Sequence, residues 1–100
     1  MQPDLTEVLP LLQRDVRTTV GHAHVQLVQD IARDVQELDV EYKAEKLVED
    51  VQQHFHDTGV DPTWPSCPIH SQHPLWYRDG AWWCAKDGVA VTKLGELAGR

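Results

Sequence analysis

Residues 67–70 have the sequence Cys-Pro-Ile-His, and residues 83–88 have the sequence Trp-Cys-Ala-Lys-Asp-Gly. Each stretch places two potential metal ligands three positions apart on what we expect to be a tight turn. The four candidate ligands are Cys67, His70, Cys84 and Asp87. Zinc binds about four such side chains in a tetrahedron, and two turns of this kind can supply all of them. The pattern therefore predicts a site for Zn2+ that joins two bends of the chain.

These residues resemble a zinc ribbon, and the resemblance covers roughly residues 64–93 and nothing before them. Members of that family hold zinc between two short Cys-x-x-Cys turns, often with Pro in the first pair, Gly after the second, and an aromatic residue before the second. The chain departs from the family at His70, an ordinary substitution for cysteine, and at Asp87, a rarer oxygen ligand. His73, three residues beyond His70, is the alternative fourth ligand.

Two other arrangements of the cysteines are open. Cys67 and Cys84 could form a disulfide, which would stabilise the chain by about 3 kcal/mol in an oxidising compartment. They could also be buried thiols, with His70 a simple turn residue. The first residues lack the basic and apolar regions of a signal peptide, so we expect a cytoplasmic location, where a metal is favoured over a disulfide. No apolar run reaches the length of about 18 residues that a membrane span requires.

Charge divides the chain into two parts. The net charge of −7 lies entirely in residues 1–58, which have 12 acidic and 5 basic side chains, whereas residues 59–100 have 4 of each. We therefore expect an acidic helical region over residues 1–60 and a zinc-ribbon-like β module over residues 61–100. An acidic surface repels phosphate backbones, so direct binding to nucleic acid is disfavoured.

Apolar residues from Leu12 to Leu38 recur at steps of three and four, which predicts helix, with Asp15 on the opposite polar face. Asp4 followed by Glu7 is typical of a helix start, and we expect a kink or a restart near Pro10. Residues 22–28 also alternate between polar and apolar, so this segment could be helix, with a possible break at Gly21, or strand.

A second helix is predicted from an N-cap at Asp39 to a C-cap at Gly59. No Gly or Pro separates Leu38 from Val40, so the two helices could form a hairpin or one helix of more than 40 residues, about 60 Å long. A monomer could not cover the apolar stripe of such a long helix, which would need a partner chain.

A hairpin with its turn at Asp79-Gly80 is predicted to join strands at residues 75–78 and 81–84, and a third strand follows at residues 89–92. The proline-rich residues 61–68 favour a stiff extended connector. We expect Trp64 to pack where the two parts meet. Because Trp82 and Trp83 are adjacent on a strand, they should face opposite ways. The fold class expected is thus α+β, with helices followed by a three-stranded module.

No catalytic signature is present, so we expect a non-catalytic, zinc-stabilised interaction or adaptor protein. Its helices would self-associate into a homo-oligomer or bind another protein. One alternative is an accessory regulator of transcription or DNA-handling machinery, which the resemblance to zinc ribbons implies. The other is a small zinc hydrolase, in which Cys67, His70 and Cys84 hold the metal and Asp87 or His73 acts as a base.

Overall fold

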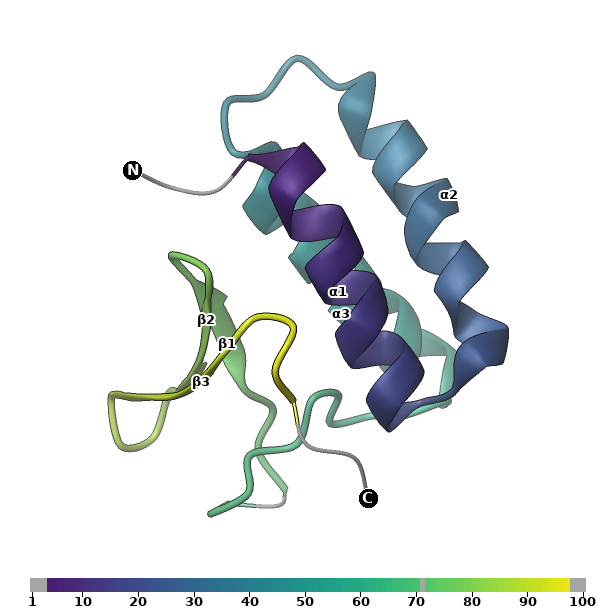
Figure 1. Ribbon diagram of the computed structural model, residues 1–100. Helices are drawn as coiled ribbons and strands as arrows, with labels where there is room; N and C mark the ends of the chain where they lie inside the picture. Colours follow the sequence, from purple (N-terminus) through teal and green to yellow (C-terminus); the bar gives the residue numbers. More distant parts are fainter. Residues whose placement is uncertain (1–3, 71, 98–100) are drawn as a thin grey trace.

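The structure is a computed structural model, and it describes residues 4–70 and 72–97. Three α-helices precede a three-stranded antiparallel sheet, which confirms the predicted α+β class (Figure 1). In chain order the elements are α1 (Leu5–Thr19), the 3-10 turn η1 (His22–His24), α2 (Val25–Gln36), α3 (Lys43–Thr58), β1 (Trp76–Arg78), β2 (Ala81–Cys84) and β3 (Val89–Lys93). The expected absence of a signal peptide falls largely on residues 1–3 and so lies outside the described residues.

Helix α1 begins where the sequence predicts. The side chain of Asp4 accepts a hydrogen bond from the backbone N–H of Glu7 at 3.0 Å, as an N-cap should. The predicted restart at Pro10 is wrong, because α1 is continuous from Leu5 to Thr19. Pro10 lies in the second turn, where its missing N–H affects the carbonyl of Thr6, an exposed residue whose carbonyl can bind water instead.

Residues 22–28 are helical, and the strand interpretation is wrong. The chain breaks at Gly21, where φ is 125°, a value that an L-residue rarely adopts, and it then re-enters helix through η1. A second break between α2 and α3 excludes the single long helix among the described residues. In the view of Figure 1, the chain reverses direction at each break, so neighbouring helices run antiparallel.

The start predicted for the second helix is wrong. Helix α3 begins at Lys43 after Tyr42, which makes no capping side-chain bond, rather than after Asp39. The ammonium of Lys43 donates to the backbone oxygen of Gln36 at 2.7 Å and so ties the start of α3 to the end of α2. The predicted C-cap is confirmed, because Gly59 adopts the left-handed conformation with φ 73°.

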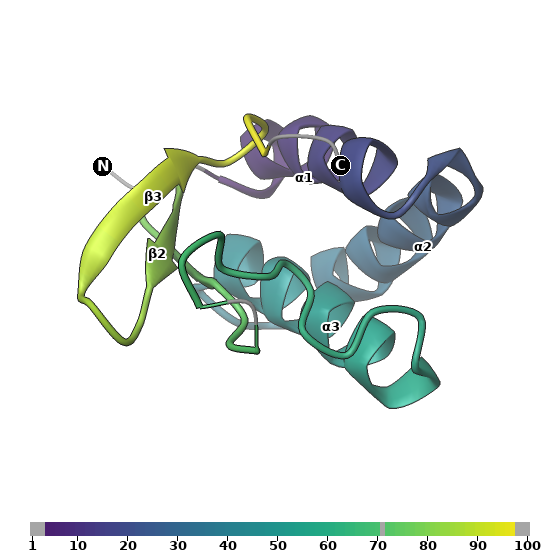
Figure 2. The same cartoon turned by 90° about the horizontal axis from the view of Figure 1, so that it is seen from below.

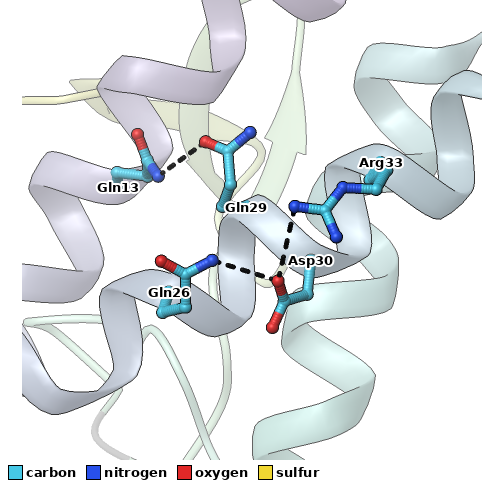
Figure 3. A network of polar contacts seen from close by, with 5 residues as sticks. All are labelled: Gln13, Gln26, Gln29, Asp30 and Arg33. Atoms are coloured by element: carbon cyan, nitrogen blue, oxygen red, sulfur yellow. Dashed lines mark hydrogen bonds and ion pairs between the residues drawn. The ribbon is translucent and has the colours of Figure 1, made fainter.

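The helices pack through their apolar faces and carry polar side chains outside. On the outer side, the amide of Gln13 in α1 donates to Gln29 in α2 at 3.4 Å, and Gln26 and Arg33 both reach Asp30 (Figure 3). An exposed ion pair such as Arg33–Asp30 contributes little to stability. The helices are therefore held together mainly by their buried faces. No helix among the described residues is both long and apolar enough to cross a membrane.

The predicted hairpin is confirmed. Strands β1 and β2 pair antiparallel, and both residues of the turn have positive φ, 50° at Asp79 and 81° at Gly80. Strand β3 pairs with β2, with an irregularity between Trp82 and Trp83. As expected of adjacent residues, these two differ in burial: Trp82 is fully buried, and Trp83 is partly exposed.

Aromatic rings join the sheet to the helices. Phe55 of α3 packs edge-on against Trp64 at 5.2 Å between ring centroids, and Trp64 packs in the same way against Trp82 of β2 at 5.5 Å. The expected packing of Trp64 between the two parts is therefore confirmed. The extended connector is wrong for residues 61–65, which turn sharply, with the N–H of Trp64 donating to the oxygen of Asp61 at 3.1 Å, whereas Ser66 pairs with Pro74 in an isolated bridge.

One buried carboxylate connects α1 to the rest of the chain. Asp15 is fully buried, and its predicted place on the polar face is wrong. Its Oδ2 accepts from the indole N–H of Trp82 at 2.8 Å and from the N–H of Gly95 at 2.7 Å, and its Oδ1 accepts from the N–H of Leu97 at 2.9 Å. Burial raises the pKa of this carboxyl above its ordinary value, and the three donors offset only part of that rise. Figure 2 shows the segment after β3 running back to α1.

We expect Asp15→Asn to lower the free energy of unfolding by about 2–4 kcal/mol, because the amide would leave at least one buried N–H donor without an acceptor. Urea denaturation followed by tryptophan fluorescence measures this change. Asp30→Asn is the matched control. Its carboxylate is exposed and lies 4.0 Å from Arg33, so it should change stability by less than about 0.5 kcal/mol. Equal effects of the two substitutions would contradict the role given to Asp15.

The raised pKa of Asp15 also predicts a dependence on pH. The folded chain holds this proton more tightly than the unfolded chain, in which the ordinary value is 3.8. Stability from this group is therefore greatest below 3.8 and falls as pH rises through the folded-state pKa. Asn does not titrate, so the stability advantage of the natural chain over Asp15→Asn should shrink between acidic and neutral pH. An advantage that grows with pH would contradict the direction of the shift.

Candidate metal centre

The first cysteine lies in a closed loop between Ser66 and Pro74, which form an isolated antiparallel bridge. Within the loop, the N–H of Cys67 donates to the carbonyl of His73 at 3.0 Å, and the N–H of His73 donates to the carbonyl of His70 at 2.9 Å. Cys67 is buried, whereas the residues that follow it come back toward the surface. These bonds therefore fix the backbone that carries Cys67 and His70.

The second cysteine ends β2. The N–H of Asp87 points at the sulfur of Cys84 at 3.4 Å, and the N–H of Gly88 donates to the carbonyl of Cys84 at 2.7 Å. Gly88 has φ 70°, a conformation that suits glycine and lets the chain turn sharply into β3. The turn thus holds the carboxylate of Asp87 on the same side as the buried thiol of Cys84.

In both turns, backbone amides that follow the cysteine interact with its sulfur. The sulfur of Cys67 interacts with the amides of Ile69 and His70, just as that of Cys84 interacts with the amide three residues on. Burial has the largest effect on the pKa of the Cys67 thiol and raises it, but these amides and the Cys84 thiol together bring the pKa below its ordinary value. A thiolate is the form of cysteine that binds metal, so this environment suits a metal ligand.

Three of the four candidate ligands converge. Ligand atoms of His70, Cys84 and Asp87 all lie within 4.8 Å of one another, so this group could hold a metal ion. Nε2 of His70 and Oδ2 of Asp87 are 3.1 Å apart. Bond lengths of about 2.0–2.3 Å place ligand atoms roughly 3.5 Å apart around one tetrahedral ion. The His70–Asp87 pair would therefore open slightly around an ion, whereas a pair at the 4.8 Å limit would close by about 1 Å. Cys67, the fourth candidate, is not a member of this group, although its sulfur interacts with the Cys84 thiol.

The alternatives for these residues differ in geometry. The ring of His73 lies 6.2 Å from the ring of His70, and His73 is exposed and outside the converging group. Both Cys67 and Cys84 are free thiols, so no disulfide joins them. Among the described residues, the structure therefore favours Asp87 over His73 as the companion of His70 and Cys84.

Sequence reasoning missed the backbone donors at this site. The amides of Ile69, His70 and Asp87 all interact with a cysteine sulfur. The equal spacing of the two ligand pairs could have indicated them, because a turn that brings residues i and i+3 together also turns the amide of i+3 toward residue i. Two similar backbone turns thus accompany the three converging side chains.

Comparisons of this chain with known protein families, with curated proteins and with solved structures give no match.

We expect removal of any converging side chain to weaken metal binding strongly, whereas His73→Ala should leave it unchanged. The matched pair is His70→Ala and His73→Ala, two histidines three positions apart in the same loop. Loss of a side chain that merely supports a metal ligand costs about 10–100-fold in affinity, so loss of His70 should cost at least that. Titration with Co2+, followed by the absorption of its bonds to thiolate, measures the affinities. Equal losses for both variants would contradict the geometry.

Proposed function

We propose that this protein is a non-catalytic interaction protein whose sheet carries a structural zinc ion, bound by Cys67, His70, Cys84 and Asp87. The observation that carries the proposal is the convergence of a histidine, a cysteine and an aspartate from two separate turns. A mixture of sulfur, nitrogen and oxygen ligands suits zinc, a borderline-soft ion with no geometric preference of its own.

The ion would order the two turns rather than the whole chain. A structural zinc can contribute on the order of 10–16 kcal/mol to small peptides that are unfolded without it. Here the sheet already shares its core with the helices through Trp82 and Trp64. The turns themselves are poorly covered, since Pro68, Ile69 and residues 85–89 are exposed. The expected effect of zinc is therefore smaller and local to these turns.

Asp87 distinguishes a structural site from a hydrolytic one. As a fourth protein ligand it would close the tetrahedron, whereas a catalytic zinc keeps one position for water. Its carboxylate lies 3.1 Å from the ring nitrogen of His70 and makes up part of the converging group. This position supports Asp87 as a zinc ligand rather than as the base of a zinc hydrolase.

The interaction role rests on apolar side chains that remain exposed. Most of the helical stripe that predicted self-association packs in or against the core of one chain, and only Ala23 and Leu38 of it are exposed, so it gives little support to a homo-oligomer. Trp76 is 64% exposed and Ile69 is 62% exposed. Large apolar side chains in such positions are typical anchors at protein interfaces. We therefore propose a separate protein partner, in a reducing compartment such as the cytoplasm, where the thiols stay available for zinc.

The experiment for this proposal is metal analysis of the purified protein, followed by thermal unfolding before and after chelation. We expect about one zinc ion per chain and a lower melting temperature without it. Cys84→Ser should lose the ion and respond little to the chelator. Tyr42→Ala, which is distant in sequence from both turns, serves as the control that keeps the metal. Protein that is free of metal and indifferent to chelation would contradict the proposal.

A further inference from the structure

We infer that the surface between α3 and β1 binds a protein segment that carries lysine or arginine beside an apolar residue. This inference rests on the proposed interaction role and names the kind of partner. The surface, called the Trp76 groove below, comprises two adjoining hollows of about 360 and 270 Å³. Residues lining one or both hollows include Glu49, Gln52, Pro62, Pro74, Trp76 and Tyr77.

The groove is held in shape before any partner arrives. The side-chain amide of Gln52 donates to the carbonyl of Leu75 at 2.9 Å and to that of Trp64 at 3.4 Å. The N–H of Leu75 donates to the carbonyl of Pro65 at 2.7 Å. These bonds fix β1 against α3, and a preformed site loses less conformational entropy when it binds.

Trp76 offers this groove an aromatic ring that the fold does not cover. It precedes the half-buried Tyr77 and follows the fully buried Leu75, so the alternation along β1 directs it outward. Across the strand pair it lies opposite Trp83, over whose ring the guanidinium of Arg78 sits at 5.8 Å. The chain's own arginine thus stacks on Trp83, whereas Trp76 remains 64% exposed. A partner's cation could stack on it in the same way.

The charges around the groove select a basic partner. Glu49 lines both hollows, and apart from His56 the residues that line them include no basic side chain. Burial raises the pKa of the Tyr77 hydroxyl, and the negative charges of Glu45 and Asp79 add to that rise. Two carboxylates therefore lie near the tyrosine end of the groove, and one of them, Asp79, also pairs with Arg78 at 3.8 Å. They attract lysine or arginine, and the apolar walls accept the residue beside it.

A second copy of this chain fits the groove poorly. Each copy has a net charge of −7, and most of the acidic residues lie in the helical part that frames the groove. Like charges brought together across an interface oppose association. The same charge opposes nucleic acid. A basic protein segment is therefore the occupant that the charges and the exposed ring favour together.

The experiment uses the full chain and an immobilised array of random nine-residue peptides. We expect the bound peptides to be enriched in lysine or arginine next to leucine, phenylalanine or proline. Trp76→Ala and Glu49→Lys should each weaken binding to the selected peptides about tenfold or more, because they remove the ring or reverse the local charge.

Two matched controls separate local from general effects. Tyr42→Ala removes another exposed aromatic residue, 57% exposed, and Glu41→Lys changes the net charge by the same amount as Glu49→Lys. Neither residue lines the Trp76 groove, so both variants should bind like the natural chain. Controls that weaken binding as much as the groove variants would overturn the inference. The inference would also be overturned by enrichment of acidic peptides or by no enrichment at all. A dimer of the natural chain, seen by analytical sedimentation and absent in Trp76→Ala, would overturn it as well.

Metal analysis of the same samples separates this inference from the proposed zinc site. Trp76 and Glu49 lie outside the converging ligand group, so their variants should keep the metal. A metal-free natural chain that still selects basic peptides would refute the zinc site and leave the groove intact. A metal-loaded chain that selects no peptides would refute the groove and leave the zinc site intact.

Discussion

The carboxylate of Asp15 is the constraint on which the arrangement of this fold depends. It is fully buried, yet it accepts hydrogen bonds from the side chain of Trp82 and from the backbone of Gly95 and Leu97. A buried charge without such partners would be strongly unfavourable, so α1 can occupy its place only when the sheet and the segment after it are also in place. The helices and the sheet are thereby joined by a directional contact as well as by apolar packing.

Strand β2 contacts the helices at Trp82 and contacts the loop of the first cysteine at Cys84. Trp82 of β2 faces the helices, whereas Cys84, two residues later, ends the strand beside Cys67. The ring contact between Trp64 and Trp82 holds the sheet against the helices. In the proposed function a zinc ion would hold the end of β2 at Cys84 against the loop that carries Cys67. Strand β1, with its exposed Trp76, is the edge strand that pairs with β2, the strand on which both of these attachments lie.

Features set by neighbouring residues were predictable from sequence. The Asp79-Gly80 turn, the cap at Gly59 and the break at Gly21 each follow from backbone preferences of one or two residues. Equal spacing brought His70, Cys84 and Asp87 forward as candidates, and the structure places their ligand atoms together. The buried state of Asp15 could not be read in this way, because its donors lie 67–82 residues further along the chain. The N-cap preference of Asp39 was likewise overridden, since α3 begins only at Lys43, whose ammonium bonds back to Gln36.

The distance in sequence between Asp15 and its donors has a consequence for how the chain is made. Contacts separated by 80 and 82 residues cannot form until Gly95 and Leu97 have left the ribosome. Until then the carboxylate of Asp15 lacks two of its three protein donors, and only the indole N–H of Trp82 and water can satisfy it. Closing so long a loop is slow compared with local helix formation. The helices can therefore form as they are synthesised, whereas the full set of hydrogen bonds to Asp15 forms only after Leu97 has emerged.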